Sequence, residues 1–149
     1  MDRIIGRCGL YCGACTIYRA ERDRPLLRER LAGHFGCELE EIRCVGCAPD
    51  DPGCWTPGCE RSRCLRDRGL ENCALCPDAG PETCALFTEL RERYLARGFD
   101  LTESLALLRE KGDLEWLERM EARFGCPACG ARLILDDENC PRCGKEVSR

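Results

Sequence analysis

Cysteine is the residue type through which this chain can do chemistry, since it occurs sixteen times in 149 residues. Five pairs have the spacing Cys-x2-Cys, and a two-residue spacer lets one tight turn supply two thiolate ligands to a metal ion. These pairs are Cys12 with Cys15, Cys44 with Cys47, Cys73 with Cys76, Cys126 with Cys129, and Cys140 with Cys143. Residues 1–7 contain no apolar segment typical of a secretory signal, so we expect a reducing, cytoplasmic location. There, clustered cysteines favour metal binding over disulfides.

The last two pairs repeat one metal-binding turn, CPACG at residues 126–130 and CPRCG at 140–144. Zinc prefers four ligands at tetrahedral corners, about 2.3 Å from each sulfur. We therefore expect a zinc ribbon held by Cys126, Cys129, Cys140 and Cys143, with a short strand over 132–135 and a polar turn over 136–139. A rubredoxin-like iron site has similar turns and stays an alternative. Four thiolates leave no open coordination position, which predicts a structural rather than a catalytic ion.

Eleven further thiols between residues 8 and 84 are candidate metal ligands. They are Cys8, Cys12, Cys15, Cys44, Cys47, Cys54, Cys59, Cys64, Cys73, Cys76 and Cys84. Their number suits two or more zinc ions, although the sequence cannot pair them. Thiolates also bind iron, so a [4Fe–4S] cluster or another iron site is the alternative. We expect Cys37 to be a small buried residue rather than a ligand, and His34, the only histidine, to lie at the solvent edge.

Charge and hydropathy narrow the classes of partner. The net charge is -4, and acidic and basic residues are interleaved, so no broad footprint for nucleic acid or an anionic membrane is expected. No apolar run approaches the roughly 18 residues of a membrane span. Four arginines over 61–68 are interpreted as the solvated face of a short helix. A protein is the expected partner, and no substrate can be named.

Helices must position these thiols. Apolar spacing predicts a helical stretch over 16–35 that is divided at Pro25 and buries Leu27, Leu31 and Phe35. A second helix is expected from Pro81 to about residue 98, and a third from residue 100, interrupted at residue 112. The predicted fold class is a small, metal-bound, α-rich (α+β) protein. Its expected parts are a Cys-rich metal-binding domain with short helices (1–98), a helical connector that completes a helical hairpin (99–123), and the zinc ribbon (124–149).

The ordered cysteine motifs are similar to those of a known family. CGLYCGAC at 8–15, CVGC at 44–47, the cysteines between 54 and 64, and GLENCALCP at 69–77 followed by Cys84 together resemble a cysteine-rich bacterial and archaeal family of unknown function. The resemblance covers nearly the whole chain. It implies a small cytoplasmic metal-binding protein, with an appended carboxy-terminal zinc ribbon in some members, and it implies that Cys37 is not a ligand.

Three functions are weighed on these residues. The favoured one is a zinc-stabilised protein-interaction or adaptor module, because metal binding can replace part of a hydrophobic core. The alternative is an iron–sulfur redox or metal-handling protein that uses the amino-terminal cysteines. A metalloenzyme would need an open coordination position with a nearby acid or base. No residue set in the sequence demands one, so we expect no catalytic residues.

Overall fold

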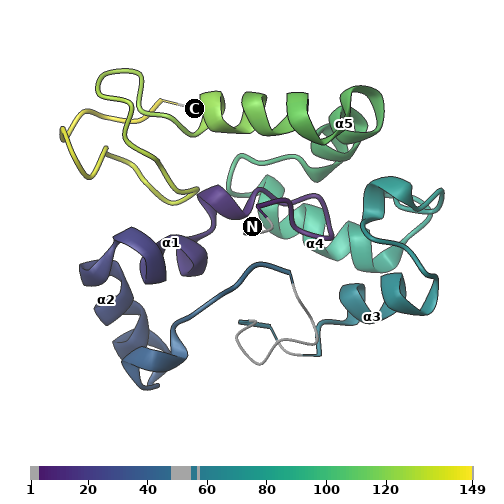
Figure 1. Ribbon diagram of the computed structural model, residues 1–149, viewed down its shortest axis with the longest axis horizontal. Helices are drawn as coiled ribbons and strands as arrows, with labels where there is room; N and C mark the ends of the chain where they lie inside the picture. The colour runs from purple at the N-terminus through teal and green to yellow at the C-terminus, as the bar shows by residue number, and fades with distance from the viewer. Residues whose placement is uncertain (1–3, 48–54, 57, 149) are drawn as a thin grey trace.

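The computed structural model describes residues 4–47, 55–56 and 58–148, and five α-helices lie within these ranges. The helices are α1 (Thr16–Asp23), α2 (Pro25–Phe35), α3 (Glu60–Asp67), α4 (Ala85–Leu95) and α5 (Leu101–Arg123), and they are joined by the single 3-10 turns η1 (Cys12–Ala14), η2 (Leu39–Glu41) and η3 (Cys73–Leu75). The protein is small and mostly helical, as predicted (Figure 1).

The helix boundaries follow from local sequence signals. Pro25 occupies the first position of α2, where its missing N–H costs no hydrogen bond. Asp100 caps α5 by accepting a 2.8 Å hydrogen bond from the backbone N–H of Thr102. Gly112 interrupts α5 with φ 78° and ψ 178°, a conformation that favours glycine. The divisions at 25 and 112 are therefore confirmed, whereas α4 begins at Ala85 rather than at Pro81.

Little extended structure occurs in the described ranges. The bridges there are isolated ones, Ile5 with Tyr11, Gly125 with Arg132, and Asn139 with Glu146. The strand expected over 132–135 is therefore wrong, because only Arg132 of these residues pairs in this way and the chain enters a turn at 135–136. The carboxy-terminal segment gains its order from turns instead.

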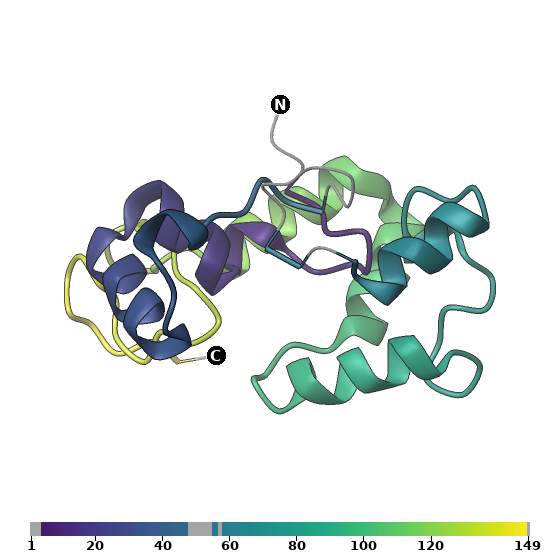
Figure 2. The same ribbon diagram turned by 90° about the horizontal axis from the view of Figure 1, so that it is seen from below.

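The two views agree on how the elements are arranged. Helices α1 and α2 lie at one end of the molecule with the carboxy-terminal segment beside them (Figure 1). Helices α3 and α4 lie toward the other end in both views (Figure 2), and α5 runs along the top of the view in Figure 1. Residues more than a hundred positions apart in the sequence are thus neighbours.

The main apolar core joins the amino-terminal loop to both halves of α5. The ring of Tyr11 lies 5.9 Å from that of Trp116 and 5.6 Å from that of Phe124, and all three side chains are buried. Trp116 Nε1 donates to Ser104 Oγ at 3.0 Å, and Ser104 Oγ donates to the Gly9 carbonyl at 2.7 Å. This buried relay fixes α5 against the loop that carries Cys8 and Cys12.

A smaller apolar cluster lies between α1 and α2. Its buried members are Ile17, Ala20, Ala32 and Ile42, and Leu27 and Leu31 pack against it as predicted. Phe35 was also expected to be buried, but 50% of its surface is exposed. It lies at the last position of α2, where its ring contacts Trp55 rather than the cluster.

Candidate metal centres

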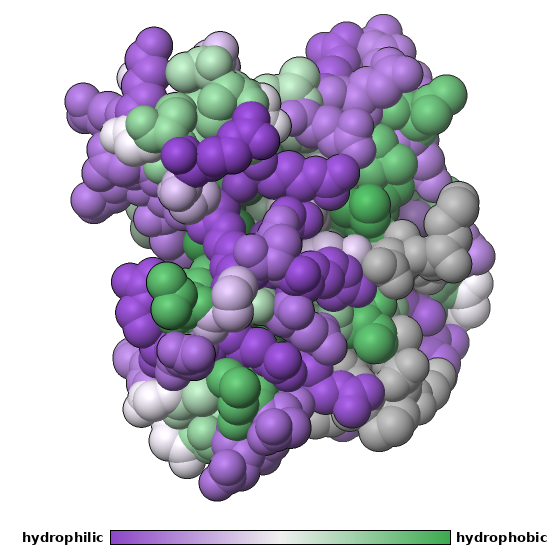
Figure 3. Space-filling view, turned by 60° about the vertical axis from the view of Figure 1, so that its left-hand side comes forward, coloured by the Kyte–Doolittle hydropathy of each residue, from purple (hydrophilic) through white to green (hydrophobic). Residues whose placement is uncertain are grey.

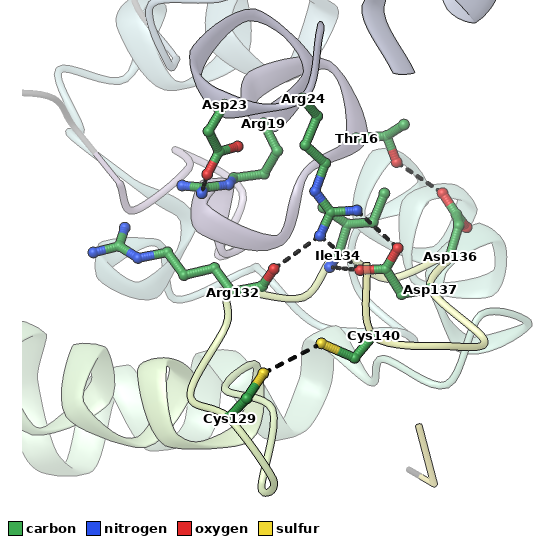
Figure 4. A network of polar contacts seen from close by, with 10 residues as sticks. All are labelled: Thr16, Arg19, Asp23, Arg24, Cys129, Arg132, Ile134, Asp136, Asp137 and Cys140. Carbon is green, nitrogen blue, oxygen red and sulfur yellow. Dashed lines mark hydrogen bonds and ion pairs between the residues drawn. The ribbon is translucent and has the colours of Figure 1, made fainter. Parts of the chain in front are cut away.

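Four cysteines of the carboxy-terminal segment converge on one point. The Sγ atoms of Cys126, Cys129, Cys140 and Cys143 all lie within 4.8 Å of one another. Cys126 and Cys143 are 3.7 Å apart, and Cys129 and Cys140 are 3.6 Å apart (Figure 4). Sulfurs placed tetrahedrally about 2.3 Å from a zinc ion are about 3.8 Å apart. The group, called the C-terminal site below, therefore has the dimensions of a single-ion site.

Two equivalent turns build the C-terminal site. The N–H of Gly130 donates to the Cys126 carbonyl at 2.8 Å, and the N–H of Gly144 donates to the Cys140 carbonyl at 2.9 Å. Both glycines have positive φ, 70° and 73°, which a side chain would strain. The repeated CPxCG sequence therefore produces a repeated ligand-bearing turn.

Backbone donors prepare the site for thiolates. Hydrogen bonding from the Ala131 N–H, assisted by the Arg142 guanidinium, lowers the pKa of Cys129 to about 6. The backbone N–H groups of Cys143 and Arg142 also lower the pKa of Cys140. For Cys143, the Lys145 N–H lowers the pKa, but burial and the neighbouring thiols outweigh it and raise the pKa to about 11. Because metal ligation requires deprotonated sulfur, the donors to Cys129 and Cys140 favour the form of these thiols that binds a metal.

Acidic side chains anchor this segment to the helices (Figure 4). Arg24 donates to both carboxylate oxygens of Asp137, at 2.8 and 2.7 Å. Asp136 accepts from Thr16 at 2.7 Å and from Arg97 at 2.9 and 2.6 Å. The polar turn expected over 136–139 therefore has a second role that the sequence did not reveal, since two consecutive aspartates do not identify their partners.

Two amino-terminal pairs come together from distant parts of the sequence. A hydrogen bond between the Cys12 and Cys47 side chains, together with burial, raises the pKa of Cys12. Burial raises the pKa of Cys15, and the neighbouring Cys44 thiol adds to the shift. The four residues Cys12, Cys15, Cys44 and Cys47 are called the N-terminal pairs below. The fold therefore brings Cys12 to Cys47 and places Cys15 near Cys44, a proximity that the spacing alone did not reveal.

A second set of cysteines lines a cavity of about 100 Å³ between α3, η3 and the start of α4. These pocket cysteines are Cys64, Cys73, Cys76 and Cys84, and Cys8 reaches the same cavity. Burial and then the neighbouring thiols of Cys76, Cys84 and Cys64 raise the pKa of Cys73 to about 11. The fold therefore gathers four thiols that the sequence distributes over 21 positions.

Arginines hold the η3 turn of this pocket. Arg109 of α5 donates to the carbonyls of Ala74, Cys76 and Ala79 at 3.0, 2.9 and 3.1 Å. Arg68 approaches the Cys76 sulfur at 3.3 Å while it pairs with Asp78 at 2.6 Å. The face of α3 was interpreted as wholly solvated, and Arg68 corrects this, because its guanidinium reaches a thiol at the rim of the pocket.

The remaining candidates have varied positions. Cys59 lies at the N-cap of α3, Cys37 packs against the α1–α2 cluster, and His34 is exposed beside the Phe35 ring. Cys54 lies outside the described residues. No disulfide joins the cysteines that the structure describes. In these same ranges, the C-terminal site is the one group of three or more potential ligands within 4.8 Å of one another.

The hydrophobic patches on the surface do not indicate which class of partner the protein binds. On the face shown in Figure 3, hydrophobic residues form separate small patches among hydrophilic ones. No helix in the described ranges has both the length and the apolar character needed to cross a membrane.

Fold and site together define a small, mostly helical, cysteine-rich protein with a four-cysteine group that can hold a metal ion. The family model described as "Protein of unknown function (DUF3795)" matches residues 4–89, more than half of the chain, and the chain belongs to this family. The match includes the N-terminal pairs and the pocket cysteines but ends within α4. It is thus narrower than the expected resemblance over nearly the whole chain. The comparisons with curated proteins and with solved structures found no significant match.

Proposed function

We propose that this protein is a zinc-stabilised protein-interaction module and that the C-terminal site binds a structural zinc ion in a zinc ribbon. One observation carries the proposal: four sulfurs lie at the spacing of a tetrahedral zinc site. With four thiolates bound, the ion keeps no position for water or substrate, so its contribution is to folding.

The arrangement of the segment explains why an ion is needed. The C-terminal site has a small apolar cluster. Among the residues that the structure describes, its buried members are the two ligands Cys126 and Cys140 and a single leucine, Leu133. Burying one leucine contributes roughly 1.5–3 kcal/mol, whereas structural zinc contributes about 10–16 kcal/mol in small zinc-binding peptides. Zinc binding is therefore the main source of order, and the anchors Asp136 and Asp137 then fix the ordered segment to the helices.

The proposed role in protein interaction rests on the exposed residues of the second metal-binding turn. Residues 141–146 of the second turn are exposed, and the zinc ion would hold them rigid. The proposed partner is a protein in the cytoplasm, because the basic and acidic residues of this segment are balanced in number and do not favour nucleic acid. The N-terminal pairs are a further candidate metal site, supported by the hydrogen bond between the Cys12 and Cys47 side chains. The alternative function, an iron–sulfur protein, is favoured by the pocket cysteines.

Cys129→Ser tests the zinc proposal. We expect the variant to lose one zinc ion per chain and to lose amide hydrogen-exchange protection over residues 125–148, while its helical circular dichroism is retained, since the main core lies in a separate cluster. Cys37→Ser is the matched control and should keep the full zinc content. Unchanged zinc in Cys129→Ser would contradict the proposal. In-cell crosslinking should capture partners with the parent chain and fail with Cys129→Ser; equal capture would argue against the interaction role.

A further inference from the structure

We propose that Cys64, Cys73, Cys76 and Cys84 bind an iron–sulfur cluster in the cavity between α3, η3 and α4. The inference goes beyond the proposed zinc function because the two sites share no ligand. It assigns a definite set of residues to iron, and each of its steps depends on the geometry of the pocket.

Four separate positions of the backbone bring these thiols to one cavity. Cys64 lies within α3, Cys73 and Cys76 flank η3, and Cys84 is the N-cap residue of α4. All four line the same space of about 100 Å³. A single water needs only about 10–15 Å³ of such space, so the cavity has room for a group of several atoms.

The spacing of the sulfurs separates a cluster from a single ion. Within the described ranges, no three of the pocket cysteines have Sγ atoms that all lie within 4.8 Å of one another, unlike those of the C-terminal site. Thiolates that share one zinc ion are about 3.8 Å apart. The thiolates of a [4Fe–4S] cluster bind different iron atoms and therefore stand farther apart. The pocket cysteines thus line one cavity without converging on a single point as the sulfurs of the C-terminal site do.

The lining of the cavity suits a buried anionic cluster. Leu65, Phe87 and Leu90 form part of its wall, and all three are buried. Arg61 and Arg68 also line it, as does Asp78, which pairs with Arg68, while Arg61 pairs with Glu89. A cluster with four thiolates is an anion, and nearby cations offset the cost of placing its charge among apolar side chains. Arg68 already contacts one of the sulfurs.

The choice of four ligands from five thiols follows from the elements that carry them. Cys64, Cys73, Cys76 and Cys84 belong to α3, η3 and the N-cap of α4, which enclose the cavity, whereas Cys8 reaches it from the amino-terminal loop. Arg109 donates to the carbonyls of Ala74, Cys76 and Ala79 and so holds the turn that carries Cys73 and Cys76.

The test uses the full chain, purified without oxygen and then reconstituted with ferrous iron and sulfide. We expect a brown protein with bound iron and acid-labile sulfide, and a Mössbauer spectrum of irons with sulfur coordination. Cys73→Ser and Cys84→Ser should each lose the visible absorbance and at least three quarters of the iron. Cys37→Ser should keep both, and Cys129→Ser should lose zinc while keeping iron and sulfide.

The outcomes are distinct. Iron and sulfide that depend on Cys73 and Cys84 support the cluster. Zinc without iron in the pocket, iron without sulfide, or a visible band that survives both serine variants would overturn it. If the serine variants fail to fold, the Mössbauer spectrum and sulfide content of the parent chain decide the question. Failure of the zinc proposal alone would appear as unchanged zinc in Cys129→Ser with iron still present.

Discussion

The ion pair between Arg24 and Asp137 should be a main attachment of the carboxy-terminal segment to the helices. Its two side chains are only 13% and 12% exposed, and two short hydrogen bonds join them. Hydrogen bonds to charged groups contribute about 1.5–3 kcal/mol each, and breaking a fully buried pair costs about 3–5 kcal/mol. Since this pair keeps some contact with water, we expect a coupling free energy of about 2 kcal/mol.

A double-mutant cycle of Arg24→Gln and Asp137→Asn measures this coupling. The asparagine retains an oxygen that can accept the Ile134 N–H now bound to the Asp137 carboxylate, so the cycle isolates the ion pair. Unfolding is followed in urea, with zinc and a reductant present throughout. For a chain of this size, a loss of about 2 kcal/mol in the free energy of unfolding corresponds to a fall of roughly 4–8 °C in Tm.

The matched control is the exposed pair between Glu115 and Arg119. These residues are one turn apart on α5, and their side chains are 43% and 55% exposed. Such pairs contribute about 0.3–0.5 kcal/mol. A coupling at Arg24–Asp137 no larger than that of the control would refute the reasoning, because it would mean that this ion pair is not a main attachment of the segment.

Two further predictions concern α5. Ser104→Ala should lower the free energy of unfolding by about 2–4 kcal/mol in urea titrations, because it leaves the buried Trp116 N–H and the Gly9 carbonyl without their shared partner; a cost below about 0.5 kcal/mol would show that the relay is not needed. Asp100→Ala should cost about 0.5–2 kcal/mol at neutral pH through loss of the N-cap, and Asp113→Ala, which removes an exposed carboxylate of the same helix, should cost less.

The effect of Asp100 should depend on pH. Burial acts to raise its pKa, but hydrogen bonds from Arg91 and Thr102 outweigh burial and lower the pKa below its usual value. The carboxylate therefore stabilises the fold fully above the unfolded pKa of about 3.9, and this contribution is lost as the pH falls through the folded-state pKa. An Asp100→Ala penalty that stays constant from neutral pH to below pH 3 would contradict this account.

Local signals predicted most of the helices and the C-terminal site. Pro25 and Gly112 divide helices by their own backbone preferences, so their effects do not depend on the rest of the fold. The two CPxCG turns likewise contain their ligands, glycines and hydrogen bonds within five residues each. Features of this kind can be inferred from sequence because their causes are close together in the chain.

The remaining features depend on tertiary structure. Spacing could not reveal that Cys64 shares a cavity with Cys84, or that Arg109 of α5 holds the turn between Cys73 and Cys76, because these contacts join elements that are far apart in sequence. The exposed position of Phe35 was missed for a related reason. Helical periodicity placed it on the buried stripe, but the cluster between α1 and α2 packs against Ala32 and Cys37 and leaves the ring of Phe35 outside.

The anchors at Asp136 and Asp137 have a consequence for how the protein is made. Thr16 and Asp136 are 120 residues apart, and Arg24 and Asp137 are 113 residues apart. On the ribosome, at about 5–20 residues per second, α1 and α2 emerge several seconds before the residues that hold them. During that interval Thr16 and Arg24 lack the aspartates that they contact in the folded protein. The attachment of α1 and α2 to the carboxy-terminal segment can therefore form only after residues 136 and 137 have been synthesised.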